Sequence, residues 1–213
     1  MKKRRLVIIV SALMVGGAAY ILGWSTLFTV SAVEIKGTDA ALPSGVVKGE
    51  KLARVEPRIV ARVFEKNDWV KSATVSRNWI TGKVSITITE RTPIAIYNNL
   101  AIDAQGASFM IRNKDVAQLP KIQAPNVDSA IIAAAFFRQL PTDIAAQVRM
   151  VKAHSGDTFF LELVTKSGNL ELRWGRSEEN ALKAKVYRAL LLQPENKNLK
   201  RVDVSAPHAP IVK

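Results

Sequence analysis

The sequence predicts an α+β protein, in which a single N-terminal transmembrane helix precedes two folded domains. A run of mostly apolar residues, Leu6–Trp24, follows four basic residues and carries no charge, which favours one membrane helix. Beyond residue 33, short segments alternate between apolar and polar residues as strands do, and other segments repeat apolar residues at helical spacing. Both strands and helices are therefore expected after the membrane helix.

Composition limits the possible classes of protein. The chain has 213 residues, which is the length of one or two domains. With 48% hydrophobic and 23% charged residues, it has the composition of a folded protein. Because it contains no cysteine, disulfides, iron–sulfur clusters, cysteine-ligated zinc sites and thiol nucleophiles are excluded.

The net charge of +13 is spread along the chain. Residues 1–33 contribute +4, residues 34–97 contribute 11 − 7 = +4, and residues 98–213 contribute 16 − 11 = +5. The densest cluster after the N-terminus, residues 197–201, has no aromatic residues among its lysines and arginine on which bases could stack. We therefore predict no nucleic-acid binding.

The N-terminal segment predicts both an anchor and its orientation. At 1.5 Å per residue, the run Leu6–Trp24 spans about 28 Å, close to the thickness of the hydrocarbon core. The preceding positive charges predict that residues 1–5 form a cytoplasmic basic tail, that residues 6–28 form the transmembrane helix, and that the rest is exported. Tyr20 and Trp24 would lie near the far interface.

A cleavable signal peptide is the alternative, because Val30-Ser31-Ala32 has the small-residue spacing of a cleavage site. The apolar run is longer than a typical signal peptide core, which favours a retained anchor. Both interpretations place residues 33–213 outside the cytoplasm.

Residues 29–97 are predicted to form the first domain. Its first strand is Val33–Ile35, and residues 39–49 contain too much proline and glycine for a regular helix. A helix then begins after Glu56, which is placed to cap it, with Pro57 in the first turn. Its inward stripe is predicted to hold Ile59, Val60, Val63 and Phe64, with Arg58, Arg62 and Glu65 outside.

A hairpin is predicted to complete this domain. Its first strand, Trp69–Arg77, points Val70, Ala73 and Val75 inward, and the spacing from Val70 to Ala73 indicates a bulge. Gly82 marks the turn. The second strand points Val84, Ile86 and Ile88 inward.

Residues 98–213 are predicted to form a mainly antiparallel β-domain with two helices. The first helix covers Ser129–Leu140, with Ile132, Ala135, Phe136 and Leu140 inward. The second is capped by Ser177 and buries Leu182, Val186, Ala189 and Leu190, with Lys183, Lys185 and Arg188 outside. The predicted strands are Val148–Lys152, Phe159–Val164 and Leu170–Trp174, with hairpin turns at residues 155–157 and 166–169.

The order of strand, poorly helical segment, helix and hairpin directly after a membrane helix is that of a POTRA domain. The segments Trp69–Arg77 and Glu90–Ala95 resemble the FtsQ/DivIB family of bacterial cell division proteins. Further segments occur in the family's order, so the resemblance covers nearly the whole chain: Ile102–Gly106, Leu119–Ile122, Leu170–Gly175 and Val202–Ser205.

Two departures from the family are expected to have local effects. The first POTRA helix, which usually precedes a segment corresponding to Gly49–Leu52, should be short or rudimentary here. Ile80 stands where a proline is common in the hairpin, so the turn depends on Gly82.

The residues do not suggest an enzyme. His154 and His208 are the only histidines, and neither belongs to a metal-binding motif. Ser155 is adjacent to His154, a spacing that does not make a nucleophile and base. Asp103 and Asp157 precede turns, where an aspartate stabilises the backbone. We predict no catalytic, cofactor-binding or metal-binding residues.

The resemblance implies a bitopic scaffold of the divisome at the division septum, which links cytoplasmic ring assembly to septal wall synthesis. Its implied partners are FtsB/DivIC-like and FtsL-like bitopic proteins, together with septal wall synthase components and the bilayer around the N-terminal helix. The alternatives are a membrane-anchored POTRA module of secretion or envelope assembly and an exported wall-binding protein.

Family resemblance places partner binding at the C-terminal end of the β-domain. The candidate is an exposed edge strand formed by Arg201, Val202, Asp203, Val204 and Ser205, with the tail through Val212. As period-2 residues, Val202 and Val204 could instead face the core, which would leave the other three outward. Pro207 and Pro210 would end the strand or protect its edge.

Overall fold

The computed structural model describes residues 2–23, 28–112, 114–154 and 157–213. It contains five α-helices, two 3₁₀-helices (η) and twelve strands within these residues. In chain order they are α1 Lys2–Gly23, β1 Ala32–Lys36, α2 Pro57–Glu65, β2 Val70–Arg77, β3 Lys83–Glu90, β4 Pro93–Tyr97, β5 Leu100–Asp103, β6 Ser108–Met110, η1 Lys114–Gln118, β7 Lys121–Gln123, α3 Val127–Gln139, α4 Thr142–Ala145, β8 Val148–Ala153, β9 Thr158–Thr165, β10 Gly168–Arg176, α5 Asn180–Leu192, η2 Pro194–Asn196, β11 Arg201–Asp203 and β12 Ile211–Val212.

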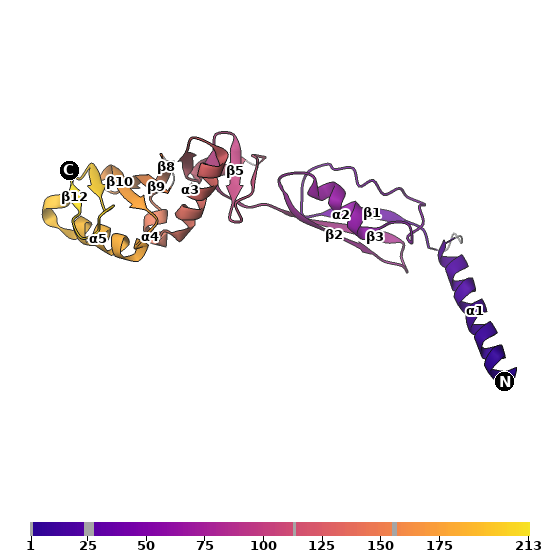
Figure 1. Ribbon diagram of the computed structural model, residues 1–213. Helices are drawn as coiled ribbons and strands as arrows, with labels where there is room; N and C mark the ends of the chain where they lie inside the picture. Colours follow the sequence, from indigo (N-terminus) through magenta and orange to yellow (C-terminus); the bar gives the residue numbers. More distant parts are fainter. Residues whose placement is uncertain (1, 24–27, 113, 155–156) are drawn as a thin grey trace. The chain divides into compact units, whose positions relative to one another are not determined.

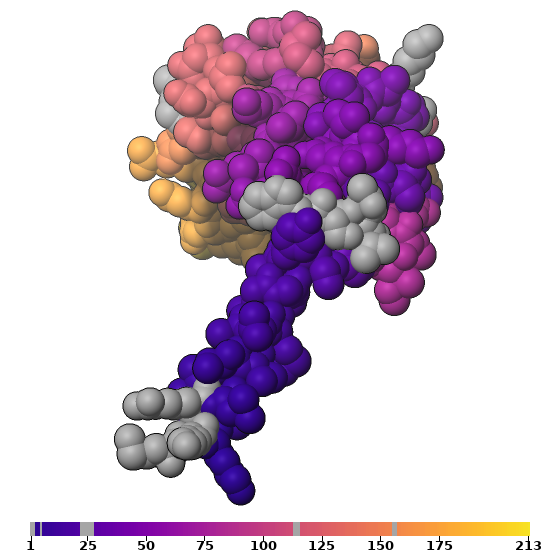
Figure 2. Space-filling model, turned by 90° about the vertical axis from the view of Figure 1, so that its right-hand side faces the viewer, coloured from indigo at the N-terminus to yellow at the C-terminus, as the bar shows by residue number. Residues whose placement is uncertain are grey.

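The chain divides into two compact units, and the boundary between them in the sequence falls between Arg91 and Thr92. α1 belongs to the N-terminal part of the first unit, and its described side chains are exposed (Figure 2). No helix among the described residues is both long enough and apolar enough to cross a membrane. Trp24, predicted at the membrane interface, and Ser155 and Gly156, predicted in a turn, lie outside the described residues.

The first unit contains a three-stranded sheet in the order β1-β3-β2 (Figure 1). β2 and β3 form the predicted antiparallel hairpin, with a register shift between Val70 and Ser72 where the bulge was expected. β1 adds to β3 in parallel, with Ala32 opposite Lys83. The inward phase of β3 is confirmed, because Val84, Ile86 and Ile88 are buried.

α2 packs its buried side chains against this sheet, and two of the four residues predicted to face inward, Val60 and Phe64, are buried. Val60, Ala61 and Phe64 are buried, whereas Ile59 and Val63 are 55% and 43% exposed. Residues 57, 60, 61 and 64 share one helical face, which excludes positions 59 and 63. Glu56 precedes the helix in an extended conformation and makes no capping hydrogen bond with its side chain.

The expected first helix of this unit is absent from the described segment between β1 and α2. Residues 37–56 form turns, bends and irregular chain instead. The segment is held by backbone bonds, since Val30 N–H donates to Glu50 C=O and Gly49 N–H donates to Val30 C=O, both at 2.8 Å. The Arg77 guanidinium donates to two further carbonyls, those of Leu52 and Val55. These partners satisfy backbone groups that a helix would otherwise pair.

The second unit contains a nine-stranded mixed sheet in the order β12-β11-β10-β9-β8-β7-β4-β5-β6. Most neighbouring pairs are antiparallel, and the parallel ones are β10 with β11, β4 with β7, and β7 with β8. β4 pairs with β5 and β7 in this sheet. Pro93–Tyr97 therefore lies in the second unit, although the sequence prediction ended the first domain at residue 97.

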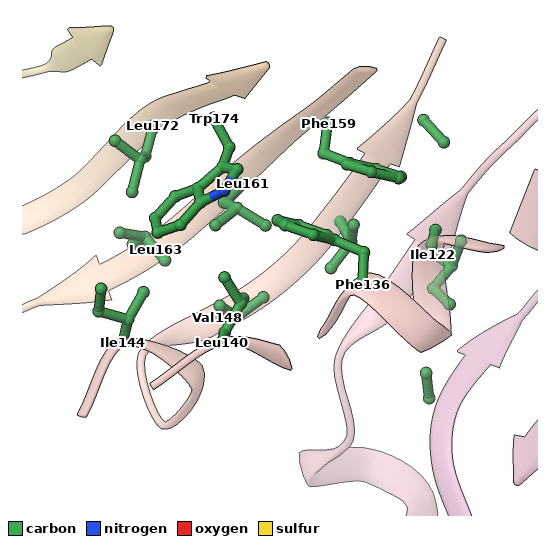
Figure 3. Close-up of a cluster of buried hydrophobic side chains, with 14 of the residues drawn as sticks. Ile122, Phe136, Leu140, Ile144, Val148, Phe159, Leu161, Leu163, Leu172 and Trp174 are labelled. Atoms are coloured by element: carbon green, nitrogen blue, oxygen red, sulfur yellow. The ribbon is translucent and has the colours of Figure 1, made fainter. Parts of the chain in front are cut away.

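Aliphatic and aromatic side chains together fill the core of the second unit between α3 and the sheet (Figure 3). The rings of Phe136 and Phe159 stack with centroids 4.1 Å apart, and Trp174 lies 6.0 Å from Phe136. α3 buries Ala130, Ala133 and Ala134 beside Phe136. The predicted inward positions Ile132 and Ala135 are exposed. Alanines allow the helix to approach the sheet closely, which a larger isoleucine at the contact would prevent.

A short helix that the sequence did not predict, α4, follows Pro141.

The buried face of α5 is shifted from the predicted one: Val186 and Leu190 are partly buried against the core as predicted, but Ala189 is exposed. The helix buries Lys183, Ala184 and Tyr187, although Lys183 was expected outside. The Lys183 ammonium donates to the Arg176 carbonyl at 2.7 Å, and burial lowers the pKa of this lysine. Ser177, the predicted cap, instead donates its hydroxyl to the Gln139 side chain.

Tyr187 provides a pH-dependent test of this packing. Its hydroxyl is buried without a hydrogen-bond partner among the described residues, and burial, followed by the nearby Asp143 carboxylate, raises its pKa to about 12. In the unfolded chain tyrosine titrates near pH 10. The folded state therefore holds this proton more tightly, and the associated stability is present below pH 10 and is lost as the pH rises toward 12.

We expect Tyr187→Phe to leave the free energy of unfolding unchanged or slightly increased at pH 7, because it removes an unpaired buried hydroxyl. Between pH 10 and 12 the wild type should lose about 2 to 3 kcal/mol relative to the variant. Denaturant unfolding of both proteins from pH 7 to 12 measures this difference. A constant difference across that range would contradict the assigned burial of the hydroxyl.

Candidate partner-binding site

The predicted site residues lie at the C-terminal edge of the second unit's sheet. β11 pairs in parallel with β10, so that Leu172 lies opposite Val202 and Arg173 lies opposite Asp203. The pairing continues past the end of β11, where Val204 N–H donates to the Arg173 carbonyl at 2.9 Å. The five predicted residues thus follow one continuous path along β10.

Burial divides these five residues into two groups. Val202 and Val204 are fully buried in the core. Their period-2 spacing thus places both side chains in the core and not on the outward face. Arg201 is exposed, and Asp203 and Ser205 are half-buried. The side chains of the two valines are therefore not available to a partner.

Ion pairs hold the outward side chains across the strands. Arg201 lies 3.3 Å from the Glu171 carboxylate, and Arg173 lies 3.4 Å from Asp203. Asp203 also accepts hydrogen bonds from the Ser205 backbone N–H and hydroxyl. Exposed pairs of this kind add little stability, but they align a row of alternating charges along the outer face of the sheet.

The edge of β11 is not free, contrary to the prediction. β12 pairs with it antiparallel, with Val202 opposite Val212 and Asp203 opposite Ile211. Arg201 and Lys213 exchange both backbone hydrogen bonds at 3.0 Å. The C-terminal tail folds back after Pro207 and covers the strand that the sequence prediction placed at the edge, so β12 is the edge strand.

The hydrogen-bond alternation decides which groups of β12 face outward. Because residues 201 and 213 form a hydrogen-bonded pair, Val202 and Val212 form a non-hydrogen-bonded pair. The N–H and C=O of Val212 therefore point away from β11. Pro210, two residues earlier, has no N–H, which leaves Val212 as the outward backbone donor of this short edge.

A hollow lies beside this edge on the outer face of the sheet. Its volume is about 450 Å³. It is lined by Phe160, Glu171, Arg173, Arg201, Asp203, Ile211 and Lys213. The Arg173 guanidinium lies 5.5 Å from the centre of the Phe160 ring. The hollow thus combines one aromatic surface with charges of both signs, directly next to the outward backbone groups of β12.

Gly175 allows the chain after β11 to approach β10 closely. Its φ is +74°, and a Cβ there would lie 2.7 Å from the Ser205 Cβ and 3.1 Å from the Ser205 Cα. Both the left-handed backbone and this short separation favour glycine. Gly175 therefore fixes the position at which the candidate strand leaves the sheet.

Comparisons with known proteins match both units. Residues 28–91 match the model of the FtsQ-type POTRA domain, and residues 95–205 match that of the C-terminal region of Cell division protein FtsQ/DivIB. The chain belongs to the FtsQ/DivIB family. Its relatives include Cell division protein FtsQ of Streptomyces venezuelae, 31% identical over 93% of this chain and 79% of the relative.

Two further FtsQ relatives match nearly the whole chain. Cell division protein FtsQ of Streptomyces coelicolor is 28% identical over 97% of this chain and 87% of its own length. That of Corynebacterium glutamicum is 25% identical over 97% of both. The family resemblance predicted from the sequence is confirmed by these matches.

The match to the FtsQ/DivIB C-terminal model ends at Ser205, before β12 begins. Sequence reasoning missed Ile211 and Val212 as the covering strand, because two apolar residues after Pro210 are too short a signal for a strand. It also missed Phe160 and Arg173, which strand pairing places opposite each other on β9 and β10.

Among the described residues, the acidic residues and histidines do not gather into a metal-binding cluster. No group of three or more histidines, aspartates and glutamates that could hold a metal ion occurs among the described residues. Asp103 is buried, and its carboxylate accepts the backbone N–H groups of Gln105 and Ala107, both at 2.9 Å. This is the predicted turn-stabilising role.

Proposed function

We propose that this protein is a membrane-anchored, non-enzymatic scaffold of the divisome, located at the septum, that acts by binding other bitopic division proteins. The observation that carries the proposal is the match of both units to FtsQ/DivIB models in chain order. The partners proposed are FtsB/DivIC-like and FtsL-like proteins, with septal wall synthase components reached through them.

The proposed anchor is the N-terminal helix, with a basic tail of residues 1–5 in the cytoplasm. Its support is the uncharged run Leu6–Trp24, which extends beyond the described part of α1. Large apolar side chains along the described helix, from Leu6 to Ile21, are exposed. Contact of such a surface with water is unfavourable, and a bilayer would remove it.

The proposed partner site is the edge formed by β12, beside the hollow lined by Phe160 and Arg173. A partner strand would add to the Val212 backbone groups, and its side chains would contact the outward Arg201, Asp203 and Ser205. Recognition by strand addition draws affinity from backbone bonds and specificity from adjacent side-chain pockets. Val202 and Val204 would support the strand from the core.

The alternative function is a POTRA module of secretion or envelope assembly. Depletion of the protein followed by microscopy separates the two. Filamentous cells with failed septa are expected for the divisome scaffold, whereas normal septation with defective export would contradict it.

The partner site is tested in the same cells with Val212→Pro. This change removes the outward N–H but retains the backbone bonds made by its neighbours, so co-purification of the FtsB/DivIC-like partner should fall at least about tenfold. Val212→Ala retains the N–H and should bind and restore septation like the wild type. Unreduced partner recovery with folded Val212→Pro would place the interface elsewhere.

A further inference from the structure

The turn between β2 and β3 carries an apolar residue that the first unit leaves uncovered. Ile80 is 96% exposed. The turn is nevertheless held firmly, because the Asn78 side-chain oxygen accepts the N–H groups of Ile80 and Thr81, both at 3.0 Å. Gly82 N–H also donates to the Asn78 carbonyl. Ile80 is therefore held outward by an ordered turn, which we call the hairpin tip (residues 78–82).

The hairpin tip is tied to the chain that directly follows the N-terminal helix. Ser31 N–H donates to the Gly82 carbonyl at 2.8 Å, and the Ser31 hydroxyl donates to the Thr81 carbonyl at 2.7 Å. The Phe28 ring lies edge-to-face against Trp79, with centroids 6.0 Å apart. The Trp79 ring of the hairpin tip thus contacts the Phe28 ring.

Chain length limits how far the tip can lie from the end of the apolar run. Phe28 follows Trp24 by four residues, which extended chain spans in at most about 14 Å. If the run lies in a bilayer, Phe28 lies within that distance of the point where the chain leaves the hydrocarbon core, and the hairpin tip lies next to Phe28. Trp and Tyr rings are favoured in this interfacial layer.

The side chains around the tip suit a lipid surface. Arg77 lies over the Trp79 ring at 5.2 Å, and Lys83 begins β3 immediately after the tip. Lys83 also pairs with Glu34 at 2.7 Å. Lys51 is brought to the same end by the bridge between its backbone and Thr29. Basic residues beside an exposed Ile80 and a half-buried Trp79 are a pattern of interfacial membrane contacts, although the Arg77 guanidinium also donates to the Leu52 and Val55 carbonyls.

We propose that the hairpin tip is a second membrane contact, in which Ile80 and the edge of Trp79 enter the interface of the bilayer that holds the N-terminal helix. This inference rests on the proposed membrane anchor. With both contacts in place, the first unit has one fixed orientation relative to the bilayer. β2 rises about 23 Å from Val70 to Arg77, so the end of the sheet at Val70 and Glu90 points away from the lipid.

The absence of cysteine from the sequence allows single-site labelling of the full chain. A fluorophore is attached to Thr81→Cys at the tip, to Lys66→Cys at the far end of the unit, or to Ser11→Cys in α1. Positions 81, 66 and 11 are all exposed. Each protein is reconstituted into vesicles of phosphatidylcholine and phosphatidylglycerol, with nitroxide-bearing lipids as the quencher. The Thr81 probe is also examined with Ile80→Asp.

The Thr81 and Ser11 probes should be quenched by the lipid nitroxide at least about threefold more strongly than the Lys66 probe. Ile80→Asp should reduce quenching at Thr81 toward the Lys66 value, because a carboxylate is unfavourable at this depth.

Quenching at Ser11 with none at Thr81 would overturn the tip contact and leave the anchor in place. Equal quenching at Thr81 with and without Ile80→Asp would overturn the role of Ile80. No quenching at Ser11 would overturn the anchor, and the tip contact with it.

Discussion

Phe64→Ala should destabilise the first unit by about 3 to 5 kcal/mol, the usual cost of removing a buried aromatic ring. Phe64 is 1% exposed and lies on the face of α2 that contacts the sheet. The unit is small and has one helix over three strands, so few neighbouring side chains can move to fill the cavity. Faster amide hydrogen exchange in β2 and β3 of the full chain measures the loss.

Ile59→Ala is the matched control for this prediction. Ile59 belongs to the same helix and is comparably apolar, but it is 55% exposed, and its truncation should cost less than about 1 kcal/mol. Both residues were predicted to face inward, so the two substitutions test which part of the predicted stripe is buried. Equal changes in exchange for both variants would show that the assigned face is wrong.

Gly175→Ala should detach the C-terminal strands from the sheet of the second unit. The new Cβ would meet Ser205 at distances that real structures do not tolerate, and alanine is strained at a φ of +74°. We expect a loss of about 2 to 4 kcal/mol. β12 joins the sheet only through β11, which pairs with β10 next to this contact. Partner binding at β12 should therefore fall together with stability. Denaturant unfolding and partner co-purification measure the two effects.

Gly168→Ala provides the comparison, since Gly168 begins the same strand and also has a positive φ, of +113°. A Cβ there would meet no atom within 4 Å. This variant carries backbone strain without the steric contact, so its stability loss should be smaller and partner binding should persist. A loss in Gly168→Ala as large as that in Gly175→Ala would show that strain, rather than contact with Ser205, decides the effect.

Local patterns in the sequence were sufficient where one feature dominated a segment. Strict alternation determined the inward phase of β3, and Pro57 marked the beginning of α2. The spacing of Val70 and Ala73 located the bulge of β2. The spacing of Val202 and Val204 indicated that both could face the core, and both are buried. Such features depend on neighbours in the chain, which is why the sequence alone reveals them.

Tertiary structure decided which helical faces are buried. α3 has apolar residues on several sides, so helical spacing alone did not distinguish Ile132 from Ala133, and close packing on the sheet selected the alanines. In α5, burial of Lys183 depends on the Arg176 carbonyl, which lies seven residues earlier in the chain and accepts a hydrogen bond from the Lys183 ammonium. A long polar side chain at a buried position becomes favourable only when the fold supplies such a partner.

Tertiary structure also decided the edge of the candidate site. Arg201–Asp203 contains the outward side chains that the sequence predicted, but β12 covers its backbone edge. That pairing requires the tail to turn back after Pro207, and its two-residue strand has no periodicity of its own to detect. The available backbone donor is therefore at Val212, because strand pairing between distant segments determines which groups remain at an edge.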